Sequence, residues 1–258
     1  MIIPGMIALA FLLIPLVAIL SDAPWGSFLS IASSPTALEA LRLSLIASVS
    51  AAGIAFVTGV PLAWILARDV LPGTRFWRAL VIVPLLLPPV VSGVALLSAF
   101  GRRGVVGGWI YDLTGVQFPF SIAGVILAET FVALPFLVIT VESALRTVDR
   151  EVEEAAAVDG ATTTRIFRSI TLPAIAPALV AGGVLAWARA VGEFGATITF
   201  AGNLEGSTQT MPLAVYTALE SDRDSAIALS IMLLVVAVAV LVSLRSYYMP
   251  GRRTRSGS

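Results

Sequence analysis

The chain has 258 residues, of which 58% are apolar and 12% are charged, and its mean hydropathy is +0.96. Soluble domains are about 45–50% apolar and about 25% charged, so this composition indicates an integral membrane protein. The chain has no cysteine and no histidine, which excludes disulfides, thiolate nucleophiles, cysteine-ligated metal centres and catalytic triads that need histidine. Positive and negative charges balance at sixteen each, so the net charge indicates no partner, and we expect no binding to nucleic acid.

Six apolar stretches are each close to the length that crosses a bilayer, about 20 residues. They lie at 2–20, 40–66, 79–100, 120–141, 175–200 and 226–244. We therefore predict an all-α, polytopic membrane protein with six transmembrane helices. No basic segment precedes the first stretch, and so we expect a retained span and not a cleaved signal peptide.

The arginines between these stretches are distributed unevenly, and the chain has no lysine. If the N-terminus lies inside the cell, the inner segments hold eleven arginines and the outer segments hold three. Inner loops of membrane proteins carry the excess of positive charge. We therefore expect both termini to lie in the cytoplasm.

Small residues recur at every fourth position of the second stretch, at Ala47, Ala51, Ala55, Gly59 and Ala63. Such a ridge lets two helix backbones approach closely in a membrane, which is a main source of helix association there. The pattern predicts that this face packs against another helix. The alternative is that alanine is simply common in this chain.

The third stretch contains Pro84, Pro88 and Pro89. Each proline lacks a backbone donor and clashes with the preceding turn, so this helix is expected to be kinked or broken. Broken helices in transporters often lie along the path of the substrate. A structural kink that does not contact the substrate is the alternative.

Ionisable residues within the predicted spans are few: Glu129 lies in the fourth, and Arg189 and Glu193 lie in the fifth. Such residues usually face the interior of a helix bundle or water. Arg189 and Glu193 are four residues apart and can form an ion pair on one helix face. The pair either neutralises itself between helices or lies beside a route for a charged solute.

The segment between the fourth and fifth spans is predicted to form two short helices, at 149–158 and 162–170. Gly160 separates them and suits the left-handed conformation that ends many helices. Each helix carries a small apolar face, formed by Val152, Ala155 and Ala156 in the first and by Ile166, Phe167 and Ile170 in the second. A polar loop with such faces is typical of an element that docks a partner.

Glu154-Ala155-Ala156, then Gly160, then Ile170-Thr171-Leu172-Pro173 resembles, at every spacing, the EAA loop of ABC-importer permeases. In that family the loop forms a coupling helix that seats in a cleft of the ATPase subunit. The resemblance implies the transmembrane domain of a type I importer. It also implies that the ATPase is coupled through Glu154, Ala155, Ala156, Gly160, Phe167, Ile170, Leu172 and Pro173.

This resemblance divides the chain into three parts. Residues 1–40 would form the first transmembrane helix and an outer loop. Residues 41–244 would form the type 1 transmembrane domain, with the coupling loop at 149–173. Residues 245–258 would form a basic cytoplasmic tail.

Two further stretches resemble one branch of the family. LPPVVSGVALL at 87–97, followed by GRRG at 101–104, resembles the third-span region of molybdate permeases. GEFGAT at 192–197, with FAGN at 200–203 and TQTMPLAVY at 208–216, is similar to the fifth-span signature of molybdate and tungstate permeases. Sulfate permeases share the Gly-Glu-Phe-Gly core, so sulfate, thiosulfate or another tetrahedral oxyanion remains the alternative substrate.

No single helix offers a dense group of cations for a dianion, which suits a path that passes the ion weakly. Hydroxyl groups and backbone donors can replace hydration without trapping an ion. We expect the translocation pathway to include Pro88, Pro89, Ser92, Glu193, Thr197 and Thr199. Outside the membrane, Thr210 is predicted to cap a short helix that starts at Met211 and Pro212. That helix either faces an external binding protein or packs over the path.

The resemblance also implies the partners: an ABC ATPase, an extracytoplasmic molybdate-binding protein, a second copy of this chain and the lipid bilayer. The chain has no phosphate-binding GxxxxGK[ST] loop, so we expect no cofactor, metal or catalytic site on it, with ATP and Mg bound by the ATPase. The expected location is the cell membrane of a bacterium or archaeon. A secondary transporter is the alternative from another class, but the proline cluster has no counterpart in the second half of the chain.

Overall fold

The computed structural model describes residues 2–248, and the side chains of residues 2–243 among them. The described residues form helices and connecting segments without strands. The elements in chain order are α1 (Ile2–Ser21), α2 (Phe28–Ala32), α3 (Pro35–Ala67), α4 (Thr74–Leu86), α5 (Pro89–Phe100), α6 (Gly107–Thr114), α7 (Ile122–Thr147), α8 (Arg150–Val158), α9 (Thr163–Ile166), the π-helical turn η1 (Phe167–Thr171), α10 (Leu172–Val191), α11 (Gly195–Phe200), α12 (Met211–Leu219) and α13 (Arg223–Tyr248).

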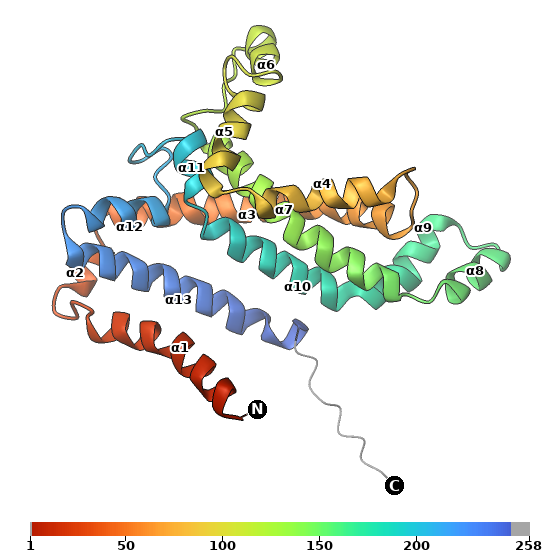
Figure 1. The fold of residues 1–258 in the computed structure, drawn as a ribbon, viewed down its shortest axis with the longest axis horizontal. Coiled ribbons are helices and arrows are strands. Elements are labelled where there is room, and N and C mark those ends of the chain that lie inside the picture. The colour runs from red at the N-terminus through yellow and green to blue at the C-terminus, as the bar shows by residue number, and fades with distance from the viewer. Residues whose placement is uncertain (1, 249–258) are drawn as a thin grey trace.

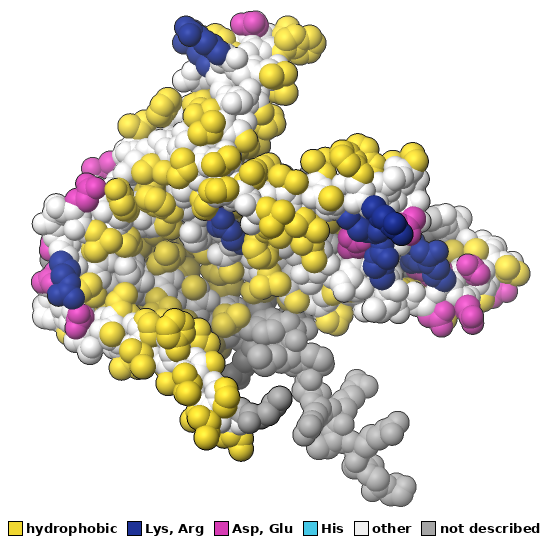
Figure 2. Space-filling view, in the orientation of Figure 1, with side chains coloured by type: hydrophobic (Ala, Val, Ile, Leu, Met, Phe, Trp, Pro, Cys, Tyr) yellow, Lys and Arg dark blue, Asp and Glu magenta, His cyan; other side chains and the backbone are white. Residues whose placement is uncertain are grey.

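Five helical segments among the described residues are long and apolar enough to cross a membrane: α1, α3, α7, the run from α9 to α10, and α13. The α4–α5 pair makes a sixth if it counts as one span. Figure 1 shows most of these helices side by side along the long axis, with α8 at one end and α2 at the other. Charged side chains gather toward the ends in Figure 2, and apolar ones cover the middle. The predicted all-α, polytopic membrane protein is confirmed.

The third span is broken, as its prolines predict. The axes of α4 and α5 differ by 117°. Leu87 and Pro88 connect the two helices with extended backbone, and Pro89 is the first residue of α5. A missing N–H costs nothing at that position. Pro88 and Pro89 have no backbone N–H, so neither can donate the hydrogen bond that would continue α4, and the helix ends before them.

The fifth span differs from its prediction at both ends. The second loop helix, expected at 162–170, continues through η1 into α10 without a break. Pro173 lies in the first turn of α10. In the wider π turn before it, the Leu172 N–H donates to the Phe167 carbonyl. The chain is therefore already out of the α-helical hydrogen-bond pattern where the proline lacks its N–H. At the other end α10 stops at Val191, and α11 begins separately at Gly195.

The core lies where α3, α7 and α10 pack together. The predicted ridge of small residues on α3 is buried. A Cβ added to Gly59 would lie 3.0–3.2 Å from side-chain atoms of Leu134, Leu137 and Val138 on α7. The ridge is therefore a close helix–helix contact, as predicted. No residue of α1 is buried, and an ion pair of 2.7 Å between Asp22 and Arg223 joins its end to the start of α13.

The predicted three-part division of the chain stays a prediction. Most of the predicted basic tail, at 249–258, lies outside the described residues.

Candidate functional site: an exposed loop and a junction of broken helices

The loop between the fourth and fifth spans projects from one end of the bundle (Figure 1). Asp149 caps α8 by accepting a hydrogen bond from the Glu151 N–H, and Thr162 caps α9 by accepting one from the Arg165 N–H. Gly160 has a φ of +85°, which is the left-handed conformation expected of it. The predicted break between two helices is confirmed.

The residues of the expected coupling loop divide into two groups. Glu154, Ala155 and Gly160 are exposed, and Ala156 is half-buried. In the second part of the motif, Phe167, Ile170 and Leu172 are half-buried and Pro173 is exposed, and Leu172 packs against the core of α3, α7 and α10. The first group is therefore free to meet a partner, whereas the second joins the loop to the bundle.

Sequence reasoning missed the residue that anchors α8. Both carboxylate oxygens of Glu153 accept hydrogen bonds from the Arg68 guanidinium, at 2.7 and 2.5 Å. Glu153 also accepts a hydrogen bond of 2.5 Å from the Thr171 hydroxyl. In the sequence Glu153 looks like its exposed neighbours Glu151 and Glu154, so only the structure identifies it.

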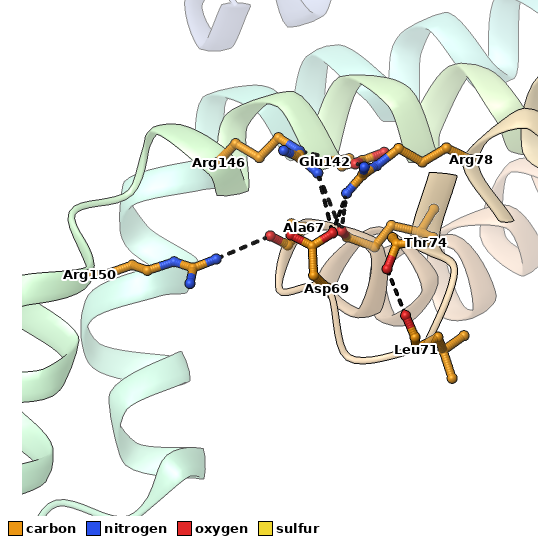
Figure 3. Close-up of polar contacts among 9 residues, drawn as sticks. Ala67, Asp69, Leu71, Thr74, Arg78, Glu142, Arg146 and Arg150 are labelled. Carbon is orange, nitrogen blue, oxygen red and sulfur yellow. Dashed lines mark hydrogen bonds and ion pairs between the residues drawn. The ribbon is translucent and has the colours of Figure 1, made fainter. Parts of the chain in front are cut away.

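Three arginines converge on the end of α3, next to the loop (Figure 3). Arg78 and Arg146 donate to the Leu66 carbonyl at 2.7 and 3.5 Å, and Arg150 donates to the Ala67 carbonyl at 3.4 Å. The last carbonyls of a helix have no partner within it and carry the negative end of its dipole. The arginines donate hydrogen bonds to these carbonyls and place positive charge at the negative end of the dipole.

Two carboxylates pair with two of these arginines. Glu142 accepts hydrogen bonds from Arg78 at 2.5 Å and from Arg146 at 3.1 Å, and Asp69 pairs with Arg78 at 2.8 Å. The group joins α3, α4 and α7 at the end of the bundle that carries α8. Charge-assisted hydrogen bonds of this kind are the strong ones, so this end of α3 is rigidly held.

The expected pathway residues meet at a second place, where α5 packs on α11. A Cβ added to Gly93 would lie 2.5 Å from the Thr199 Cβ, and one added to Gly195 would collide with Pro89. The two short helices therefore touch through their backbones. The structure brings Pro89 and Thr199 together there, and it places Pro88 at the exposed bend before α5.

The predicted hydroxyl groups differ in their partners. The Ser92 and Thr197 hydroxyl oxygens are buried and have no hydrogen-bond partner among the described residues. Thr199 is half-buried, and its hydroxyl donates to the Gly195 carbonyl at 2.8 Å. Buried unpartnered polar atoms need an explanation in a native structure, and the hydrogen-bonding capacity of these two hydroxyl groups is unused in the described structure.

The predicted ion pair within the fifth span is present. Arg189 and Glu193 are 2.5 Å apart. The Glu193 side chain is 2% exposed, and its second oxygen accepts a hydrogen bond of 2.6 Å from the Ala196 N–H at the start of α11. Glu193 therefore lies between the two helices, where its carboxylate pairs with a cation of α10 and accepts a hydrogen bond from the first turn of α11. Glu129 on α7 is also buried, and one of its carboxylate oxygens has no partner among the described residues.

The predicted outer helix exists as α12, with Pro212 in its first turn. Thr210 occupies the N-cap position as predicted, but its hydroxyl makes no cap hydrogen bond. The Met211 N–H instead donates to the Ser44 hydroxyl of α3 at 2.6 Å. The free N–H at the helix end is thus satisfied from a neighbouring helix, and Met211 and Leu213 are buried in the bundle.

Within the described part of the chain, no group of three or more acidic side chains is close enough to hold a metal ion.

Comparisons with known proteins agree with this architecture. Residues 59–256 match the protein family described as "Binding-protein-dependent transport system inner membrane component". Over 252 residues the chain is 42% identical to the molybdenum transport system permease protein ModB of Mycobacterium tuberculosis, which covers 98% of this chain and 95% of the relative. ModB of Escherichia coli is 39% identical over 211 residues, covering 82% of this chain and 92% of the relative.

Sulfate permeases are less similar. The sulfate transport system permease protein CysT of Escherichia coli is 34% identical over 239 residues, covering 91% of this chain and 86% of the relative. Among solved structures, a bacterial ABC transporter involved in the import of alginate matches with a TM-score of 0.74 and 20% identity, covering 98% of this chain and 95% of that chain. This likeness supports the fold of an ABC-importer transmembrane domain.

Proposed function

The chain belongs to the family of binding-protein-dependent transport system inner membrane components, and on that premise we propose that it is the permease subunit of an ABC importer for molybdate. It is a multi-pass membrane protein and a transport component, not an enzyme. The choice of molybdate as the substrate rests on a difference in sequence identity between two groups of relatives. Those named as molybdenum permeases are 42% and 39% identical to this chain, whereas the sulfate permease is 34% identical.

The partners follow from this function. A separate ATPase binds ATP and Mg, and the exposed face of α8 docks onto it. An extracytoplasmic binding protein delivers the oxyanion, and two copies of this chain surround one pathway. The exposed position of Glu154, Ala155 and Gly160 supports the docking, because these residues are free to contact another protein.

We place α8 and both termini on the cytoplasmic side. Arginines on α4, α7, α8 and α9 gather at the α8 end, which agrees with the excess of positive charge in inner loops. Figure 1 shows α1 running toward that end from its junction with α2 in the direction of its N-terminus. The described part of α13 runs toward the same end.

The pathway passes the junction of α5 and α11. Ser92 and Thr197 supply buried hydroxyl groups without partners in the described structure, and these can replace part of an anion's hydration. Arg189 lies near the end of α10, shortly before α11, and Glu193 neutralises it. A path with neutral donors and a balanced charge releases a dianion as readily as it accepts one. Recognition then rests with the binding protein.

Uptake of labelled molybdate into proteoliposomes tests this function. The vesicles hold this chain with its ATPase and binding protein, and ATP is enclosed. We expect ATP-dependent uptake that tungstate inhibits and a large excess of sulfate does not. Equal inhibition by sulfate would favour the second candidate, a broader oxyanion importer. No ATP-dependent uptake by an assembled complex would refute molybdate as the substrate.

A matched pair of variants tests the pathway. Ser92→Ala and Thr197→Val each remove a buried hydroxyl group without adding bulk, and we expect both to slow uptake at equal protein levels. Ser98→Ala is the control, because the Ser98 hydroxyl already donates within its own helix, to the Val94 carbonyl at 3.0 Å. Unchanged uptake in Ser92→Ala and Thr197→Val would argue against this path.

A further inference from the structure

Helix α8 is attached to the rest of the molecule by few contacts. None of its residues is buried. Short segments connect it to α7 and α9, and one of them contains Gly160 in the left-handed conformation. A helix attached in this way can rotate on its connections. Its side-chain contacts therefore decide whether it moves with the membrane helices or independently of them.

The main side-chain contact of α8 is the joint formed by Arg68, Glu153 and Thr171. Arg68 directly follows α3, and Thr171 lies in η1 at the base of α10. The carboxylate of Glu153 binds both, with contacts between 2.5 and 2.7 Å. The side chains of Arg68 and Glu153 are only 13% and 16% exposed, so water screens this pair less than a surface pair. One carboxylate thus connects α8 to two membrane-spanning helices.

The part of α3 that receives this contact is held firmly. The Leu66 and Ala67 carbonyls accept hydrogen bonds from arginines on α4, α7 and α8 (Figure 3). Glu142 holds two of those arginines. A displacement of Glu153 is therefore passed to a rigid helix end that is itself connected to the broken third span through Arg78 on α4.

We propose that Arg68, Glu153 and Thr171 form a joint that transmits movement of α8 to α3 and α10, and that it couples ATP hydrolysis to transport. The inference rests on the proposed function, in which α8 docks on the ATPase. It assigns a separate role to these positioning residues, because the joint lies on the side of α8 that faces the bundle. Glu154 and Ala155, on the free side, hold the ATPase. The joint converts that contact into movement of the membrane helices.

Five variants test the joint: Arg68→Gln, Glu153→Gln, Thr171→Val, Thr171→Ser and the charge exchange of Arg68→Glu with Glu153→Arg. We expect each single variant to insert, to co-purify with the ATPase at the wild-type level and to hydrolyse ATP. Uptake per ATP hydrolysed should fall about tenfold in the two charge variants, which is within the range of coupling effects. The charge exchange should recover part of the loss, and Thr171→Ser, which keeps the hydroxyl group, should behave as wild type.

The control removes an ion pair that makes no such connection. Arg42 and Glu39 form an exposed pair within α3, 3.7 Å apart and at the other end of that helix. Exposed pairs of this kind contribute little to stability. We expect Arg42→Gln to leave both assembly and uptake per ATP unchanged.

Amide hydrogen exchange of the assembled complex tests the joint without a transported substrate. Exchange in residues 150–158 should be faster by about tenfold in Arg68→Gln and Glu153→Gln, because local opening becomes easier when anchoring contacts are lost. Exchange in the middle of α3 should stay unchanged. This measurement separates the proposed joint from the proposed substrate. If the wild-type complex takes up no molybdate, molybdate is refuted as the substrate. The exchange rates still show whether the joint anchors α8.

Two results would overturn the proposal. One is unchanged exchange of residues 150–158 in both charge variants, which would mean that the joint does not hold α8. The other is faster exchange with wild-type uptake per ATP, which would mean that movement reaches the bundle by another route.

Discussion

Single residues set how closely α3 and α7 approach. At Gly59 an added Cβ would lie 3.0–3.2 Å from three side chains of α7. We expect Gly59→Leu to destabilise the protein by about 1–3 kcal/mol, the usual cost of overpacking a well-packed core. Gly53→Leu, on the same helix with no atom within 4 Å of the added Cβ, should have a small effect. Thermal unfolding of the two purified variants provides the comparison, and equal melting temperatures would contradict the close contact.

The Arg189–Glu193 pair gives a second prediction for single residues. Arg189→Gln leaves the carboxylate of Glu193, which is 2% exposed, without its cation. Removing one partner of a buried pair costs about 3–5 kcal/mol. The double variant Arg189→Gln with Glu193→Gln should recover part of that loss, because the glutamine at 193 can still accept the hydrogen bond from the Ala196 N–H. Melting temperatures that decrease additively would show that the two side chains are not coupled.

Helix breaks determine the elements that form the proposed pathway. Pro88 and Pro89 end α4 and start α5, so Pro88→Ala with Pro89→Ala should let a straighter helix form. We expect normal insertion but strongly reduced uptake, because α5 would no longer meet α11. Pro84→Ala, within α4 and before the break, is the control and should keep most of the activity. Wild-type uptake by the double variant would show that the bend is not needed for transport.

The exposed face of α8 gives a prediction for another element. Deleting residues 154–160 should abolish co-purification of the ATPase while the membrane helices still insert. A milder change, Glu154→Arg, should weaken co-purification, because it reverses an exposed charge on the docking face. Glu220→Arg is a matched control, since Glu220 is exposed after α12, at the opposite end of the bundle (Figure 1). Normal recovery of the ATPase with the deletion variant would refute docking through α8.

The elements that sequence reasoning located are those governed by local composition. Apolar length located the spans, the prolines predicted a kink or break in the third span, and the small-residue repeat predicted that one face of α3 packs against another helix. The separate α11 was missed because it depends on a side-chain hydrogen bond from the Ala196 N–H to Glu193. The joint was missed because Arg68 and Glu153 are 85 residues apart in the chain. Local patterns carry no information about contacts of that kind.

At the scale of the whole molecule, the fold and the arginine distribution together predict an orientation in the membrane. The α8 end carries the arginines of α4, α7, α8 and α9, and positive charge is retained on the inner side. The segment between α5 and α6 carries fewer and should lie outside. Because the chain has no cysteine, a single introduced cysteine reports its own location without interference.

We therefore expect opposite labelling of two such variants in intact cells. Val105→Cys, at a position 88% exposed between α5 and α6, should react with a membrane-impermeant maleimide. Val158→Cys, at a position 87% exposed at the end of α8, should react only after the membrane is made permeable. Both sites are similarly accessible, so any difference reflects the side of the membrane. The reverse pattern would place α8 outside, where it could not meet an ATPase, and both the orientation and the docking proposal would fail together.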